Sequence, residues 1–116
     1  MIVLLHPIYF IMIEFDKGVL DKFCVEMDDD AKTIVGMFIS DLKANAYRMK
    51  SLFEDGDFAT LSKEAHSLKG LASIFGLITL YDDCLLIEKK PSEAGSVIKS
   101  IAGYVDEVIR VLRKSL

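Results

Sequence analysis

Hydrophobic residues recur every three or four positions from residue 16 to the C-terminus, a spacing that places them on one face of an α-helix. Breaks in this pattern separate predicted helices over residues 16–27, 31–53, 58–76 and 77–89, with a last helix after Pro91 and Ser92. Short turns join these segments. We therefore predict an all-α fold, an antiparallel four-helix bundle with an additional short N-terminal helix.

Three of the predicted helices carry a clear hydrophobic stripe that should face the core of the bundle. The stripe positions are Val19, Leu20, Phe23, Cys24 and Met27 in the first helix, Ile34, Phe38, Leu42, Met49, Leu52 and Phe53 in the second, and Val97, Ile98, Ile101, Val105, Val108, Ile109 and Leu112 in the last.

Polar and glycine residues mark the predicted helix ends. The acidic run at residues 28–30 favours the start of the second helix, because carboxylates accept hydrogen bonds from free amide groups there. A metal site is the alternative interpretation of that run, but no ligand spacing follows it. Gly56 suits the end of the second helix, Asp57 the start of the third, and Ser92 the start of the last.

Residues 1–13 are mostly apolar and differ from the rest of the chain. This run is shorter than the roughly 20 residues that cross a bilayer. Glu14 and Asp16 follow it where a signal peptide would have small residues, and Pro7 interrupts any helix within it. His6, beside that proline, is interpreted as incidental.

We therefore divide the chain into an apolar N-terminal extension, residues 1–14, and a helical bundle, residues 15–116. An ordered apolar segment has to be buried, either against its own domain or against another copy of the chain. Residues 1–13 are predicted either to cap one end of the bundle or to pair with a second copy as a homodimer. Translation from Met12 is a further alternative.

The length, net charge and cysteine content indicate a single globular domain that does not bind nucleic acid. A chain of 116 residues can bury a core as one domain, and its net charge of −4 disfavours nucleic acid as a partner. Cys24 and Cys84 fit no metal or redox spacing, so we predict free core cysteines in a reducing compartment and a cytoplasmic location. No metal site and no membrane span is predicted.

The third predicted helix carries the candidate chemistry. With Leu61 set at zero on a helical wheel, four further apolar positions fall within about 40° and form the buried stripe. His66 falls at about 140°, and Lys69 falls at about 80°, at the shoulder of that stripe. Small residues surround the histidine on the wheel, and they are Ser62, Gly70 and Ser73.

These residue types suit a nucleophilic imidazole. Its unperturbed pKa is about 6.5, so one ring nitrogen has a free lone pair at neutral pH. Lys69, one turn from His66, can hold a phosphoryl oxygen, and Gly70 leaves the approach open. Glycine costs about 1 kcal/mol within a helix, so Gly70 is a departure that points to a site rather than to folding.

The stretch Ala-His-Ser-Leu-Lys-Gly at residues 65–70, with Gly76 ten residues after the histidine, resembles the histidine-containing phosphotransfer (HPt) domain. The similarity is tight over about residues 65–88 and extends loosely from about residue 15 to the C-terminus. The resemblance implies that His66 is phosphorylated through Nε2, that Lys69 stabilises the phosphoryl group, and that Gly70 admits a receiver domain.

In one branch of that family a glutamate on the next helix binds the other imidazole nitrogen, and Glu88 has the matching position here. The spacing agrees: if the chain reverses near Gly76, the helical arms to His66 and Glu88 are about 15 and about 18 Å long. A carboxylate bound to Nδ1–H would leave Nε2 as the nucleophile. The alternative is a solvated Glu88 near two lysines.

Several residues around the histidine could form a partner surface. Ile74, at about 220° on the wheel, is preferred over Leu71 as an exposed apolar contact. Tyr81 and Leu85 border the His66 face and either join that surface or pack within the bundle. The predicted partner-binding residues are Ser62, Ser73, Ile74, Tyr81 and Leu85.

The implied function is reversible phosphoryl transfer between His66 and receiver-domain aspartates, with a hybrid sensor histidine kinase as a second partner in a two-component phosphorelay. No cofactor is expected, since Mg²⁺ would belong to the receiver. The chain has no P-loop or other nucleotide motif, so it is predicted to be a carrier without ATP-dependent kinase activity. The alternative is a helical adaptor or kinase regulator that carries no phosphate.

Overall fold

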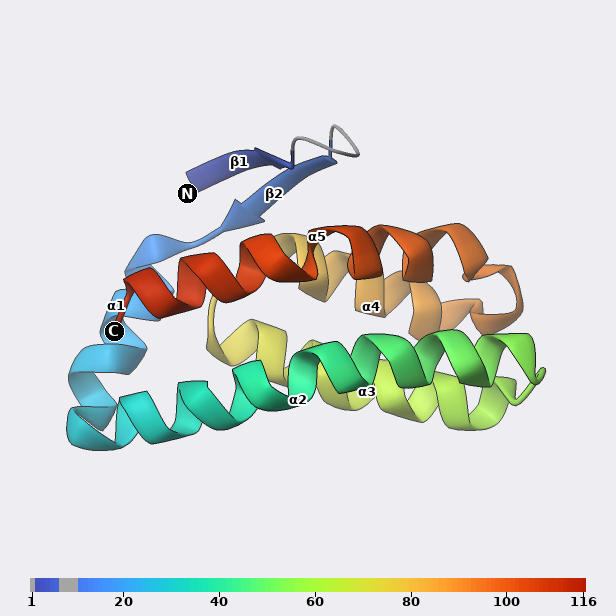
Figure 1. Ribbon diagram of the computed structural model, residues 1–116, viewed down its shortest axis with the longest axis horizontal. Helices are drawn as coiled ribbons and strands as arrows, with labels where there is room; N and C mark the ends of the chain where they lie inside the picture. The colour runs from blue at the N-terminus through green and yellow to red at the C-terminus, as the bar shows by residue number, and fades with distance from the viewer. Residues whose placement is uncertain (1, 7–10) are drawn as a thin grey trace.

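The computed structural model describes residues 2–6 and 11–116. Helices α2 (Asp29–Glu54), α3 (Phe58–Ile74), α4 (Ile78–Lys89) and α5 (Gly95–Lys114) form the antiparallel bundle (Figure 1). In this view α2 and α3 lie below α5 and α4, and the short helix α1 (Lys17–Met27) covers one end. The predicted all-α fold, with a bundle of four helices and a short N-terminal helix, is confirmed.

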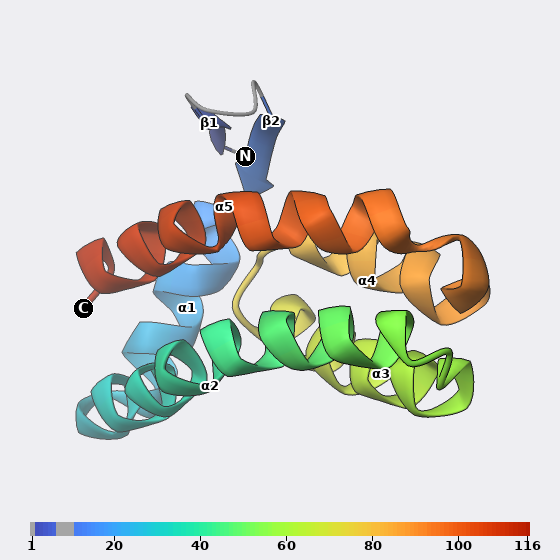
Figure 2. The same cartoon turned by 45° about the vertical axis from the view of Figure 1, so that its right-hand side comes forward.

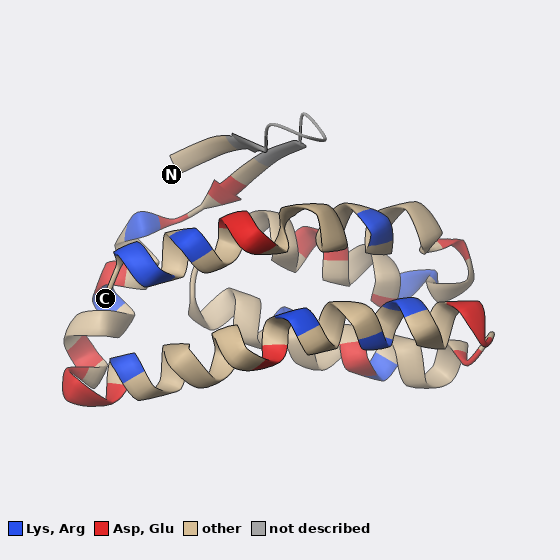
Figure 3. Ribbon diagram, in the orientation of Figure 1, with Lys and Arg blue, Asp and Glu red and all other residues tan. Residues whose placement is uncertain are grey.

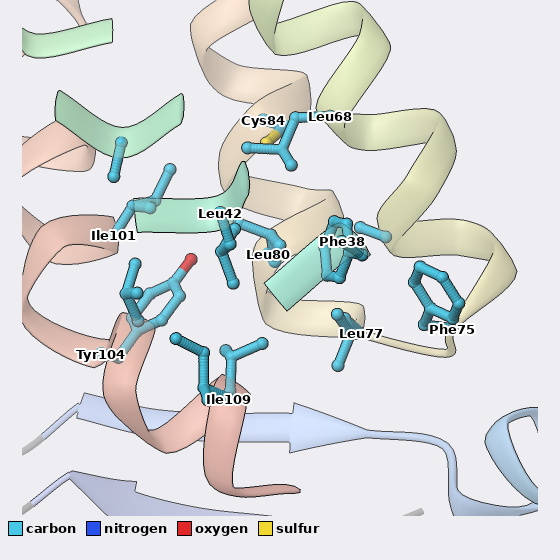
Figure 4. Close-up of a cluster of buried hydrophobic side chains, with 14 of the residues drawn as sticks. Phe38, Leu42, Leu68, Phe75, Leu77, Leu80, Cys84, Ile101, Tyr104 and Ile109 are labelled. Atoms are coloured by element: carbon cyan, nitrogen blue, oxygen red, sulfur yellow. The ribbon is translucent and has the colours of Figure 1, made fainter. Parts of the chain in front are cut away.

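The core lies between the four long helices, where each contributes one apolar face. Figure 4 shows part of it, including Phe38, Leu42, Leu80, Ile101 and Tyr104. Aromatic rings join α1 and α2 to the end of α3, since the Phe75 centroid lies 5.0 Å from that of Phe23 and 4.8 Å from that of Phe38. This packing fixes the end of α3 against both neighbours.

Most stripe positions are buried or half-buried as predicted, and the exceptions have simple causes. Ile34 is exposed, whereas Val35, which lies on the same helical face as Phe38 and Leu42, is buried in the core. In α1 only Leu20 is fully buried, while Val19 and Met27 are exposed, because a helix across the end of the bundle has few neighbours. Cys84 is buried and Cys24 only half-buried, and both thiols are free.

Helix ends follow the predicted chemistry in two places and depart from it in others. As predicted, Gly56 follows the end of α2 with a φ of +73°, and Asp57 caps α3 through the amide of Thr60. Asp16 caps α1, which was not predicted, by accepting hydrogen bonds from the amides of Gly18 and Val19. Asp28 precedes α2 without a side-chain cap, so the acidic run begins one residue before the helix rather than capping it. Ser92 is not a cap either: a short 3-10 turn, η1 (Pro91–Glu93), comes first, and Ala94 precedes α5.

The N-terminal segment forms a β-hairpin, which the sequence pattern did not predict. Strands β1 (Ile2–His6) and β2 (Ile11–Phe15) pair antiparallel, with Ile2 opposite Phe15. β2 packs against α4 and α5 and contributes the buried side chains of Ile13 and Phe15 to the core. Figure 2 shows the hairpin beside α5, above the bundle.

Part of the predicted extension lies outside the described residues, namely residue 1 and residues 7–10, which include Pro7. The pairing of residues 1–13 with a second copy stays a prediction. Within the described ranges, no helix combines the length and apolar character that a membrane crossing requires.

The turn between α3 and α4 depends on Gly76, whose φ is +71°. The backbone amide of Asp16 donates to the Gly76 carbonyl at 2.7 Å, so the start of α1 lies directly against this turn. A Cβ at position 76 would lie 2.7 Å from the backbone oxygen of Asp16. Both the backbone conformation and the close approach therefore require glycine here.

Replacing this glycine should destabilise the fold. Gly76→Ala combines an unfavourable positive φ with a backbone clash, so we expect the free energy of unfolding to fall by about 2 kcal/mol or more. Urea denaturation monitored by circular dichroism measures it. The matched control is Gly36→Ala in the exposed face of α2, where a Cβ meets nothing within 4 Å, and it should raise stability by about 0.5–1 kcal/mol. Equal stability of the two variants would contradict this account of the turn.

Candidate functional site

The candidate site begins with a histidine that stands clear of the core. In α3, Leu61, Ala65, Leu68 and Ala72 are buried, and this face packs into the bundle as the helical wheel predicts. The side chain of His66 projects from the middle of the helix and is 67% exposed. The imidazole is therefore open to a large partner while its backbone is held by a regular helix.

Helix α4 brings Glu88 to this ring. Nδ1 of His66 lies 2.8 Å from Oε1 of Glu88, across two helices that are adjacent and antiparallel. An ionised carboxylate can only accept hydrogen bonds, so the ring nitrogen that faces it must donate. In the neutral imidazole this leaves the lone pair on Nε2, at the exposed end of the ring.

Lys69 completes a three-residue group. Its Nζ lies 2.7 Å from Oε2 of Glu88, and its side chain is only 17% exposed. The same ammonium group lies 5.9 Å from the centre of the Tyr81 ring. The sequence placed Lys69 correctly at the shoulder of the core face, but the resemblance assigned its charge to a phosphoryl group. In this unphosphorylated structure that charge is paired with Glu88 instead.

The two charges stabilise each other. The hydrogen bond from Lys69, and after it the one from His66, lowers the pKa of Glu88 below its ordinary value of 4.5. The hydrogen bond to Glu88 raises the pKa of Lys69 above its ordinary value, although partial burial opposes this. Both groups are therefore charged at neutral pH, and Glu88 remains an acceptor for Nδ1–H.

The remaining predicted residues differ in their surroundings. The Ser62 hydroxyl donates to the backbone carbonyl of Glu88 at 3.0 Å and so links α3 to α4, and its contact with a partner stays a prediction. Gly70 is exposed, and a Cβ there would meet nothing within 4 Å. Ser73 is exposed and Ile74 is 50% exposed, and both lie one helical turn beyond Gly70. Leu85 is half-buried on α4.

A shallow hollow continues from the site toward the α3–α4 turn. Its volume is about 220 Å³, and it lies between the start of α1, the end of α3 and the start of α4. Ser73 and Tyr81 line it together with Gly76. Tyr81, predicted either to border the site or to pack in the bundle, does both: it is half-buried and its ring faces Lys69.

Two polar contacts of α4 were missed by the sequence reasoning. The Tyr104 hydroxyl, inside the core, donates to Oδ2 of Asp83 at 2.6 Å, and the amide of Glu14 donates to the Thr79 hydroxyl at 2.6 Å. Burial raises the pKa of Asp83, while the hydrogen bond from Tyr104 opposes that rise. A tyrosine within the apolar stripe of α5 was the available signal, since a buried tyrosine hydroxyl needs a partner.

Basic and acidic side chains are not separated into two large surface patches. Figure 3 shows basic and acidic residues interspersed along the helices, with an acidic cluster at the corner between α1 and α2. Among the residues that the structure describes, no group of three or more metal-ligating side chains converges. The site therefore consists of an exposed imidazole, a carboxylate that faces its Nδ1 atom, and an ammonium group paired with the same carboxylate.

Removing the lysine should change the titration of the glutamate. In Lys69→Met the largest cause of the lowered pKa is absent, so the pKa of Glu88 should rise toward 4.5. Because a lowered acid pKa stabilises the folded state above the unfolded value, the wild type should lose this contribution as the pH falls through the lower, folded value. The variant should show a smaller loss of stability below pH 4.5.

The carboxyl carbon resonance of Glu88, followed by NMR against pH, measures the shift directly. The matched control is Lys63→Met, on the exposed face of the same helix, which should leave the Glu88 titration unchanged. An unchanged midpoint in Lys69→Met would show that the ion pair does not hold the carboxylate in its charged form.

One comparison with known proteins identifies the family of the chain. The family model described as Hpt domain matches residues 18–110, which include His66, Lys69, Gly70 and Glu88. Searches of curated proteins and of solved structures returned no match. The matched range covers most of the chain and starts after the β-hairpin. The chain therefore belongs to the Hpt domain family, whose members are the phosphocarrier modules of histidine phosphotransfer in phosphorelays.

Proposed function

We propose that this chain carries a phosphoryl group on Nε2 of His66 and exchanges it reversibly with aspartates of response-regulator receiver domains. A hybrid sensor histidine kinase is the proposed source of the phosphoryl group. The observation that supports this most is the contact of 2.8 Å between Nδ1 of His66 and Oε1 of Glu88, on a ring whose other nitrogen is exposed. The proposal places the chain in the cytoplasm, a reducing compartment that its free cysteines suit.

The transfer step uses the exposed lone pair. Nε2 attacks the phosphorus of a receiver acyl phosphate in line with the bond to the aspartate oxygen. The N–P bond forms, the P–O bond breaks, and its electron pair leaves with the aspartate carboxylate. The ring becomes cationic and keeps its proton on Nδ1, where the negative charge of Glu88 stabilises it. The reverse step returns the phosphoryl group along the same path.

Lys69 has two candidate partners in this cycle. Before transfer its ammonium group pairs with Glu88. After transfer, the phosphoryl oxygens on the neighbouring side chain compete for the same cation, as the family resemblance implies. Glu88 would then face a cationic ring alone, which suits a phosphorylated His66.

The rest of the machinery is proposed to belong to the partners. Mg²⁺ is expected on the receiver, and ATP chemistry on the kinase, so this chain is proposed to be a carrier without its own kinase activity. The docking surface would comprise Gly70, Ser73 and Ile74 on α3 and the hollow beside Tyr81. These positions combine open backbone with exposed apolar surface, which is typical of a protein interface.

The direct test is transfer from a phosphorylated receiver. The wild-type chain should acquire a phosphate that is labile in acid and stable in alkali, and His66→Gln should acquire none, since an amide has no nucleophilic nitrogen. Radiolabelled receiver and gel separation measure it. Absence of label on the wild type, under conditions in which a known carrier is labelled, would favour the adaptor or kinase regulator over the carrier.

The access role of Gly70 can be tested separately from the chemistry. In Gly70→Leu the fold should be kept, because a Cβ there enters open space. The side chain should obstruct a docking protein, so we expect transfer from a receiver to slow by about tenfold or more. Labelling of His66 by a small phosphoramidate should keep its wild-type rate, since a small donor does not need the docking surface.

The control is Gly36→Ala, which alters a helical glycine far along the sequence from the site. Equal slowing with both donors in Gly70→Leu would mean that the substitution perturbs the imidazole itself. Unchanged rates with both donors would show that receivers approach His66 from another direction.

A further inference from the structure

The contact between His66 and Glu88 depends on how helix α4 is rotated about its own axis. With side chains, a helix has a radius of about 5–6 Å, so a rotation of about 10° moves a carboxylate by about 1 Å. A displacement of that size breaks the 2.8 Å contact between Nδ1 and Oε1.

Two polar bonds hold α4 on the side opposite Glu88. With Leu80 at zero on a wheel for α4, Glu88 falls at about 80°. Thr79 and Asp83 fall at about 260° and about 300° on the same wheel. Glu88 therefore faces α3 from one shoulder of α4. Thr79 and Asp83, four residues apart, occupy the other shoulder in the first half of the helix.

Each of the two bonds comes from a different element. The Thr79 hydroxyl accepts the amide of Glu14 in β2 at 2.6 Å, and Oδ2 of Asp83 accepts the hydroxyl of Tyr104 in α5 at 2.6 Å. Tyr104 is fully buried, so its end of the bond is fixed by the core around it. β2 is anchored in turn by the buried side chains of Ile13 and Phe15.

We propose that Thr79 and Asp83 are positioning residues, which lock α4 in the rotation that brings Glu88 to Nδ1 of His66. The N-terminal hairpin, which lies before the region matched by the family model, is thereby part of the machinery that orients the nucleophile. The proposal rests on the proposed function for its kinetic consequence, but its structural part concerns the unphosphorylated ring.

The test removes each bond with little change of shape. Tyr104→Phe deletes the hydroxyl donor, and Thr79→Val deletes the hydroxyl acceptor. The first readout is the pair of ring-nitrogen resonances of His66 in the unphosphorylated protein, which report the share of the Nδ1–H tautomer. We expect this share to fall in each variant and to fall most in the double variant.

The second readout is the rate of transfer from a phosphorylated receiver. It should fall by about three- to tenfold in the single variants and further in the double variant, since a misoriented nucleophile reacts more slowly. Thr79→Ser keeps the hydroxyl and should restore both readouts to wild-type values.

The control for general loss of stability is Ile98→Val, a core substitution in α5 on the side that faces α2. It should leave the tautomer and the rate unchanged. A wild-type tautomer share in the double variant, or an equal shift in Ile98→Val, would overturn the proposal. If the wild type accepts no phosphoryl group, the proposed function fails, and the nitrogen resonances still decide whether α4 is locked in this way.

Discussion

The carboxylate of Glu88 lies between an imidazole and an ammonium group, 2.8 Å from Nδ1 of His66 and 2.7 Å from Nζ of Lys69. One oxygen orients the ring, and the other pairs with the lysine. Lys69 lowers the pKa of Glu88 further below its ordinary value of 4.5, so a charged acceptor for Nδ1–H is present throughout the neutral pH range. The proposed reactivity of Nε2 therefore depends on a carboxylate supplied by the neighbouring helix α4.

This arrangement requires two helices held in a fixed relation, and the fold supplies that at several points. Gly76 allows the chain to reverse direction between α3 and α4, and this turn packs against the start of α1. The Ser62 hydroxyl links the helices beside Glu88 itself. The surface beside His66 is open at Gly70, where a Cβ would meet nothing within 4 Å. Glycine is unfavourable for the stability of a helix, so its presence there does not serve folding. A phosphoryl carrier that reacts within a transient complex needs both features: helices that hold the imidazole in a fixed orientation, and an open surface on which the partner can dock.

The sequence predicted the bundle and the position of His66 because both follow from helical periodicity alone. Glu88 came from the family resemblance, and the count of residues on either side of Gly76 agreed with that assignment. Periodicity was less informative at the margins. The helical period selected Ile34, whereas Val35 is the buried residue. Both positions lie within one helical turn of Phe38, at i−4 and i−3, so the period alone does not decide between them.

The β-hairpin and the contacts between distant residues could not be predicted from local sequence patterns. The β-hairpin was missed because two short apolar runs carry no helical or turn signal strong enough to specify their pairing. The bonds of Thr79 and Asp83 join residues far apart in sequence, and local patterns hold no information on such pairs. The charge pairing of Lys69 likewise needs the distance to Glu88, which only the packed helices define.

In the proposed transfer, Nδ1 of His66 keeps its proton while Nε2 accepts the phosphoryl group. NMR of the phosphorylated, nitrogen-15-labelled protein tests this most directly, through the coupling between phosphorus and the ring nitrogens of His66. Phosphorus should be bonded to Nε2, with Nδ1 still protonated and hydrogen-bonded. A phosphoryl group on Nδ1, or on a residue other than His66, would contradict it.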